Sequence, residues 1–161
     1  GHVAGAGQAF DAQARQPFAR FLHHVRIDIA YQQARALAAQ RLVNFSTRAS
    51  AGPGAKVAIV GFVISGTQDK TVLVRAIGPG LRNFGVSTAL TSPLVELYRG
   101  SALIASNTGW STGTNTADIA AAATRSGAFP LTAGSADSVV LTKLQPGAYT
   151  AIVSATNPSI V

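Results

Sequence analysis

The chain has 161 residues, of which 47% are hydrophobic and 12% charged, and thirteen Lys and Arg against six Asp and Glu give a formal net charge of +7. This apolar fraction excludes a chain that is disordered throughout, and the lack of cysteine excludes disulfides, thiol catalysis and zinc–thiolate sites. No apolar run reaches the roughly 20 residues of a membrane-spanning helix, so we expect no transmembrane segment.

The basic residues are dispersed along the chain and are not gathered in a tail. A positive balance favours anionic partners, among them acidic polysaccharide. Proteins that read nucleic acids usually combine basic clusters with interleaved aromatic residues or a known reading motif, and neither occurs in this sequence. We therefore do not expect nucleic acid to be the partner.

Residues 1–41 are expected to form a flexible leader followed by a helical arm. Segment 17–41 is rich in Ala, Gln and Arg without internal Gly or Pro, which favours a helix. Four of its apolar residues recur at helical spacing: Phe18, Leu22, Val25 and Ile29. Segment 25–31 also alternates with period two, as a strand would. Length and composition favour the helix, and the strand stays open as the alternative.

From Leu42 onward the sequence predicts β-structure. Runs rich in β-forming residues occupy 42–47, 56–64, 71–77, 94–98, 102–105, 138–144 and 149–154, and Gly- and Pro-containing turns separate them. Segment 118–123 is expected to form a short helical turn. Many short strands with regular turn signals indicate an all-β fold, an antiparallel β-sandwich of the Ig-like or jelly-roll-like kind, over residues 42–161, with the N-terminal α-helical extension before it.

Several motifs of the β-region occur together in a known order. They are the runs at 41–48, 60–66, 70–79 and 94–98, then Ile104-Ala105-Ser106-Asn107, Trp110, Asp137-Ser138 and the run at 144–153. In this order they resemble a β-sandwich repeat module of large secreted bacterial surface proteins, and the last hairpin is similar to bacterial pre-peptidase C-terminal domains. The resemblance implies an exported, non-catalytic accessory domain at an extracellular or cell-surface location.

The chain departs from this module in two places. Members often carry acidic residues between the Asn and the Trp, whereas this chain reads Asn107-Thr108-Gly109-Trp110, which weakens a calcium role because calcium prefers several oxygen ligands. The module also continues with a further apolar strand after Val153, so the sandwich is expected to lack its final strand. An open sheet edge invites pairing, and the alternating residues Val25, Ile27, Ile29 and Tyr31, or a strand of another chain, are candidates to fill it.

No set of residues points to catalysis. His23 and His24 are adjacent, so on a helix they face different directions and lack a third metal ligand at a convincing spacing. No Gly-x-Ser-x-Gly elbow occurs, and Gly78-Pro79-Gly80 lacks the lysine of a phosphate loop and is expected to be a turn. We expect no enzyme activity, no cofactor and no metal.

Trp110 is the residue best suited to bind a sugar by stacking, because it lies in a polar Gly-, Ser- and Thr-rich stretch. The alternative, which we favour, is that it folds back onto the sandwich with its indole N–H satisfied by the backbone. Asn107, Arg75 and Arg99 complete the candidate ligand face, although arginines on outward strand positions are common. Two functions follow: a structural, assembly or adhesion module that self-associates, and a carbohydrate-binding module for acidic polysaccharide.

Overall fold

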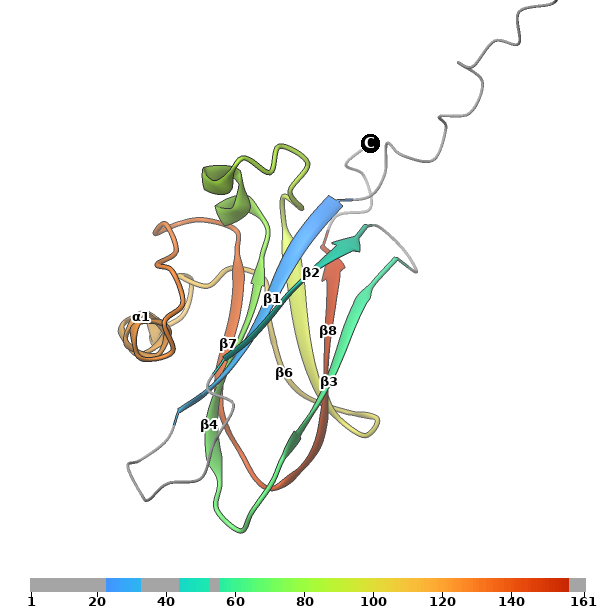
Figure 1. Ribbon diagram of the computed structural model, residues 1–161, viewed down its shortest axis with the longest axis vertical. Coiled ribbons are helices and arrows are strands. Elements are labelled where there is room, and N and C mark those ends of the chain that lie inside the picture. Colours follow the sequence, from blue (N-terminus) through green and yellow to red (C-terminus); the bar gives the residue numbers. More distant parts are fainter. Residues whose placement is uncertain (1–22, 33–43, 53–55, 157–161) are drawn as a thin grey trace, which may run out of the picture.

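Two antiparallel four-stranded sheets pack face to face in the computed structural model, which describes residues 23–32, 44–52 and 56–156 (Figure 1). The first sheet has the order β2-β1-β4-β7, formed by Asn44–Ala51, His23–Gln32, Lys70–Ile77 and Ser138–Leu144. The second has the order β3-β8-β5-β6, formed by Ala58–Ile64, Gly147–Ala155, Pro93–Arg99 and Ala102–Asn107. The antiparallel β-sandwich predicted from the sequence is confirmed.

Strand β1 corrects the prediction of a helical arm. Residues His23–Gln32 form an extended strand that pairs with β2 on one side and with β4 on the other. Val25, Ile27 and Ile29 are at most 1% exposed, because their period-two alternation turns all three β-branched side chains toward the second sheet. Burial between two partner strands therefore outweighs the helix-favouring Ala, Gln and Arg around it. The remainder of the predicted arm, 17–22 and 33–41, lies outside the described residues.

Position 42 is therefore not where the sandwich starts. Strand β1 lies in the interior of the first sheet, between β2 and β4. A strand that only completed an open sheet would lie at the edge of that sheet. The candidate assembly residues Val25, Ile27 and Ile29 pack in the chain's own core, and Tyr31 lies opposite Val72 in the register of β1 and β4. The chain's own segment His23–Gln32 therefore occupies the position between β2 and β4 in the first sheet.

The main core lies between the two sheets. The inward residues of β1 meet those of β4, β5 and β8, and Val72, Val74, Val95, Leu97 and Val153 have no measurable exposure. Tyr149 joins this core from β8, and its hydroxyl donates a hydrogen bond to the carbonyl of Gln145 at 2.8 Å. This hydrogen bond connects β8 to the turn that precedes it.

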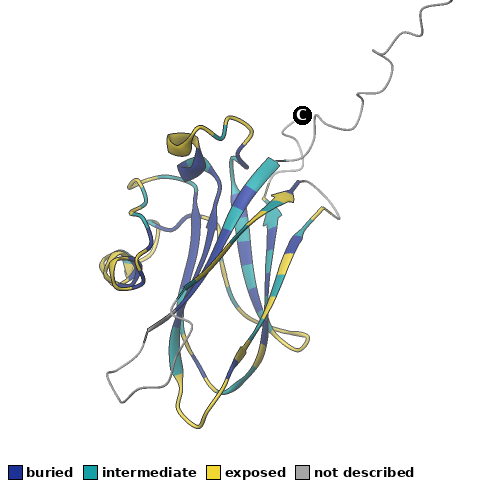
Figure 2. Cartoon of the chain, viewed as in Figure 1, coloured by how far each residue is buried: buried dark blue, intermediate teal, exposed yellow. Residues whose placement is uncertain are grey.

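A third layer covers the outer face of the first sheet. Helix α1, Thr116–Arg125, which includes the helical turn predicted at 118–123, packs Ile119, Ala122 and Ala123 against Leu73 and Val139 (Figure 1). The 3-10 helix η1, Pro79–Phe84, covers the end of the same face, where Leu81 packs on Ile77. The outer face of the first sheet is thus covered over β4 and parts of β1 and β7, whereas β2 stays exposed, and β1 and β4 are largely buried (Figure 2).

No described element covers the outer face of the second sheet. Ile59 and Val63 point outward from β3 with 61% and 66% of their surfaces exposed, and Leu103 and Ile104 of β6 are 52% and 43% exposed. Among the described strands of this sheet, the outward positions hold a single charged residue, Glu96. The outer faces of the two sheets therefore differ, because helices α1 and η1 pack on that of the first sheet and no described element packs on that of the second.

Candidate functional site

Trp110, the one tryptophan of the chain, is a packed residue of the third layer and not an open stacking platform. It is 7% exposed and belongs to the cluster of Ile119 and Ala123. Its indole Nε1–H donates to the carbonyl of Thr132 at 3.0 Å and lies 3.2 Å from Ser135 Oγ. The alternative favoured from the sequence, a tryptophan folded back with its N–H bound to backbone, describes this geometry.

Replacing Trp110 with Phe is expected to lower the free energy of unfolding by roughly 1–3 kcal/mol, because two part-buried hydrogen bonds of the indole N–H are lost and the smaller ring leaves part of the space empty. Chemical denaturation of both proteins measures this difference. In the wild type, the tryptophan fluorescence should resist iodide quenching until the protein unfolds. Quenching of the folded wild type as strong as that of the unfolded chain would contradict the buried position.

Asn107 ties the end of β6 to β7. Its Oδ1 accepts hydrogen bonds from the backbone N–H groups of Gly109 and Val139, both at 3.0 Å, and its Nδ2 donates to the carbonyl of Gly109 at 3.3 Å. Both the oxygen and the nitrogen of the side-chain amide are therefore hydrogen-bonded within the chain. This explains the Asn-x-x-Trp stretch as a corner of the sandwich.

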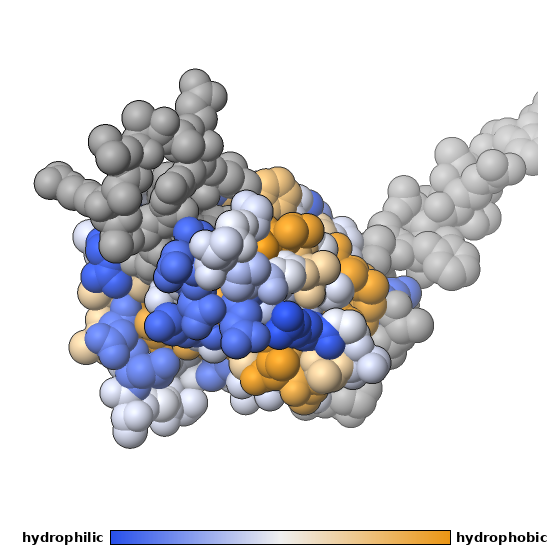
Figure 3. All heavy atoms as spheres, turned by 90° about the horizontal axis from the view of Figure 1, so that it is seen from below, coloured by the Kyte–Doolittle hydropathy of each residue, from blue (hydrophilic) through white to orange (hydrophobic). Residues whose placement is uncertain are grey.

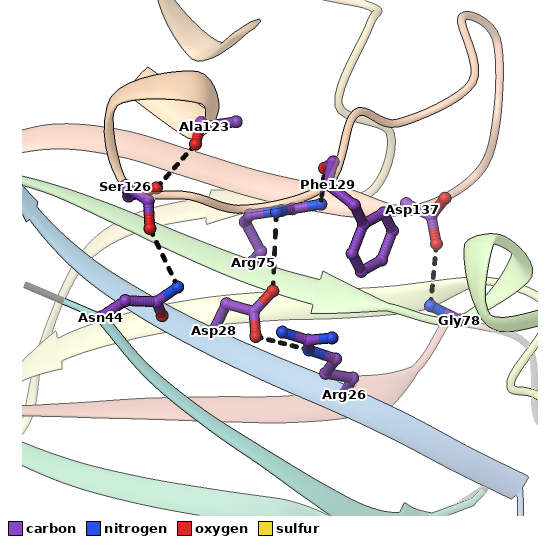
Figure 4. A network of polar contacts seen from close by, with 9 residues as sticks. All are labelled: Arg26, Asp28, Asn44, Arg75, Gly78, Ala123, Ser126, Phe129 and Asp137. Carbon is purple, nitrogen blue, oxygen red and sulfur yellow. Dashed lines mark hydrogen bonds and ion pairs between the residues drawn. The ribbon is translucent and has the colours of Figure 1, made fainter. Parts of the chain in front are cut away.

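Arg75 is buried under the third layer, with 1% of its surface exposed, and does not face solvent from its strand. Its Nη2 donates to the carbonyl of Phe129 at 2.8 Å, and its guanidinium carbon lies 4.7 Å from the centroid of the Phe129 ring (Figure 4). Its Nη1 lies 3.6 Å from Oδ2 of Asp28, which is also 1% exposed. Burial lowers the pKa of Arg75, and the Asp28 carboxylate opposes that shift.

Two arginines share the buried carboxylate of Asp28. Arg26 Nε donates to Asp28 Oδ1 at 2.7 Å, and the Arg26 guanidinium carbon lies 5.2 Å from the centroid of the Phe129 ring. In the register of β1 and β2, Arg26 lies directly opposite the exposed Arg48, an arrangement of like charges that is unfavourable in an isolated sheet. The outer face of β1 and β2 therefore holds an excess of positive charge.

An exposed aromatic ring adjoins this basic surface. Phe84 is 59% exposed and packs edge-on against Phe129 at 4.8 Å between ring centroids, while the Arg26 side chain is 32% exposed. This group was not predicted from the sequence, because a helix was favoured for segment 25–31 and the strand was kept only as the alternative. The period-two pattern was the available signal, since it places Arg26 and Asp28 on the face opposite Val25 and Ile27.

Asp137 has a structural role that explains the Gly-Pro-Gly sequence. Its Oδ1 accepts the backbone N–H groups of Gly78 at 2.8 Å and Gly80 at 3.1 Å, and Ser135 Oγ donates to its Oδ2 at 2.7 Å. A side chain at position 78 would place its Cβ 2.1 Å from the carbonyl oxygen of Leu90. In the turn predicted at 78–80, the backbone of Gly78 thus lies close to that of Leu90, and η1 begins at the next residue.

Arg99 lies at the opposite end of the sandwich from Asn107 and Trp110. Its Nη1 donates to Gln145 Oε1 at 3.1 Å, and its guanidinium carbon is 5.8 Å from the Tyr149 ring. Hydrophilic residues gather over this end, with hydrophobic patches beside them (Figure 3). The length of β6 separates Arg99 from Asn107 by roughly 17 Å, so the four candidate ligand residues do not form one site.

A cavity of about 90 Å³ lies between α1 and the segment that follows it. Trp110, Ile119, Ala120, Ala123, Thr124, Ala128, Pro130 and Leu131 line it. Only Thr124 offers a side-chain hydroxyl, and that group donates to the carbonyl of Ala120 at 3.0 Å. The lining is suited to a small apolar group and not to a charged one.

Within the described ranges, no group of three or more His, Asp or Glu side chains is placed to hold a metal ion. Across the same ranges, no helix has the length and apolar character needed to span a bilayer.

Comparison of the chain with protein-family models, with curated proteins and with solved structures gives no match. The resemblance to modules of secreted bacterial surface proteins thus remains a prediction from the sequence motifs.

Proposed function

We propose that the chain is a non-catalytic structural module that associates with further copies of itself through its second sheet. One observation supports this proposal above the others: described elements cover most of the outer face of the first sheet, whereas none covers the outer face of the second, where large apolar side chains are exposed on both edge strands. Exposed apolar surface of this kind marks interaction sites in soluble proteins.

The edges of the two sheets differ in the same sense. Edge strands β2 and β7 of the first sheet carry Arg48 and Lys143, and charged residues on an edge discourage pairing with another sheet. Edge strands β3 and β6 of the second sheet read AIVGFVI and ALIASN, without a charged residue or a proline. Charged side chains therefore protect the edges of the first sheet and are absent from the edge strands of the second.

The resemblance to modules of large secreted bacterial proteins supports an extracellular or cell-surface location for this association. In such a protein, a module that pairs with its own kind would hold neighbouring molecules together and contribute to surface architecture or adhesion.

Sedimentation velocity over a range of protein concentrations tests the proposal. We expect the wild type to sediment faster as its concentration rises, and the double variant Ile59→Lys/Val63→Lys to stay monomeric, because two charges on the uncovered face oppose its burial. The matched control, Ser46→Lys/Ser50→Lys, adds the same charge at exposed positions of β2 and should associate as the wild type does. A wild type that stays monomeric at millimolar concentration would refute the proposed function.

A second candidate function is binding of acidic polysaccharide, and the surface formed by Arg26, Arg48 and Phe84 favours it. The bond from Arg26 Nε to Asp28 holds one guanidinium in place, which suits bidentate recognition of a carboxylate or sulfate group. Phe84 offers an exposed ring beside it for the apolar face of a sugar.

Affinity electrophoresis distinguishes this second candidate from the first. We expect retardation of the wild type in gels containing polygalacturonate or dextran sulfate but not in neutral dextran, and loss of the effect in Arg48→Gln/Phe84→Ala. Arg99→Gln removes the same charge at the far end of the sandwich and should be retarded like the wild type. Equal loss in both variants would mean that only net charge is sensed.

A further inference from the structure

We propose that two copies of the chain pair their β3 strands in antiparallel fashion about a two-fold axis at Gly61, which joins their second sheets into one continuous sheet. This inference rests on the proposed function and names the surface, the partner and the register. The partner is a second copy of the same chain.

The strand is self-complementary about its centre. Strand β3 runs from Ala58 to Ile64, so Gly61 is its middle residue, with three residues on either side. Antiparallel pairing about that residue places Gly61 opposite the second copy's Gly61, and Ile59 opposite the second copy's Val63. By symmetry the same apolar pair forms twice, as a two-fold interface requires.

The outward side chains of β3 are exposed and apolar, as such pairing requires. Ile59 and Val63 have the two largest exposed fractions among the large hydrophobic residues that the structure describes, and Gly61 between them is also exposed. Cross-strand pairs of β-branched residues are favourable on the surface of a sheet. Pairing would cover each of these side chains with its counterpart.

Charge favours the β3 edge as the meeting place of two copies. The chain has a formal net charge of +7, so two copies repel each other over most of their surfaces. Residues Ala58–Ile64 include no charged side chain, whereas the edges of the first sheet present Arg48 and Lys143. Copies that meet along β3 therefore avoid direct like-charge contacts within the paired strands.

The other uncharged edge is less suited to pairing. The register of β5 and β6 shifts between Leu97 and Tyr98, so β6 carries an irregularity near its middle. A bulge of this kind bends an edge strand and interrupts its row of free hydrogen-bonding groups. The pairing of β3 with β8 runs without a shift from Ala58 to Ile64, so β3, an edge strand among those that the structure describes, is regular along its length.

Single cysteines test the register directly, because the chain has no cysteine of its own. A Cβ added at Gly61 meets no atom closer than the Tyr149 carbonyl oxygen at 3.9 Å, so Gly61→Cys fits without strain. Under mild oxidation we expect Gly61→Cys to form disulfide-linked dimers, since opposite residues lie within disulfide reach. Ile59→Cys alone should not, because its two copies would be offset by about 13 Å along the strands.

The decisive comparison mixes two variants. An equimolar mixture of Ile59→Cys and Val63→Cys should give cross-linked heterodimers, while each variant alone and the β6 control Leu103→Cys remain monomeric on non-reducing gels. Dimers of Leu103→Cys without dimers of Gly61→Cys would overturn the β3 register but keep association through the second sheet. A wild type that sediments as a monomer, together with no dimer from any variant, would overturn both.

Discussion

Replacing Asp28 with Ala is expected to lower the free energy of unfolding by about 3–5 kcal/mol, because it leaves the buried guanidinium of Arg75 without its counter-charge. Both side chains are 1% exposed, and Arg75 cannot turn to solvent while Phe129 lies over it. Equilibrium denaturation in urea measures the change. The loss should greatly exceed that of Arg48→Ala, which removes an exposed charge of the same surface.

The matched control removes both charges of the pair. In Asp28→Val/Arg75→Met, no charge of the pair remains to be desolvated, and apolar side chains fill the space between the first sheet and the third layer. This double variant should recover most of the stability lost in Asp28→Ala. If it is as unstable as the single variant, the cost does not come from an unpaired buried charge.

Ile27→Pro is expected to prevent cooperative folding. Ile27 is fully buried at the centre of β1, opposite Thr47 of β2 and Ala76 of β4. Proline removes a ladder hydrogen bond from an interior strand and cannot pack as isoleucine does. We expect the near-UV circular dichroism and the denaturation transition of the wild type to be lost.

The conservative variant Ile27→Val serves as the control, with an expected cost of about 0.5–1.5 kcal/mol from the smaller side chain. A proline variant that unfolds within about 1 kcal/mol of the wild type would contradict the interior position of β1.

The sandwich was predictable from residue 42 onward because short alternating runs and Gly- or Pro-containing turns leave little choice of fold. Strand β1 was not, since its own alternation competes with the helix-favouring Ala, Gln and Arg that surround it. Pairing on both sides with β2 and β4 decides the matter, and that pairing depends on residues far along the chain. Local propensity gives way to tertiary contacts in such a segment.

The candidate ligand residues show a different limit of sequence reasoning. The segment between β6 and β7 forms hydrogen bonds with the side chains of Trp110, Asn107 and Arg75. The sequence does not reveal where that segment packs, so it could not predict these bonds. Glu96 lies on the outer side of β5, between the buried Val95 and Leu97, and accepts a hydrogen bond from the hydroxyl of Tyr98 at 3.2 Å. Strand alternation predicts on which face of a sheet a side chain lies, whereas the burial of that side chain depends on whether another layer covers the face.

Amide hydrogen exchange read by mass spectrometry at low and high protein concentration tests association through the second sheet most directly. Peptides covering Ala58–Ile64 should gain protection as the concentration rises, because backbone groups on the outer edge of β3 acquire partners in the second copy, while peptides from β2 and β7 keep their exchange rates. If no peptide of the second sheet gains protection over a concentration range in which the protein self-associates, the uncovered sheet is not the surface that joins one copy to the next.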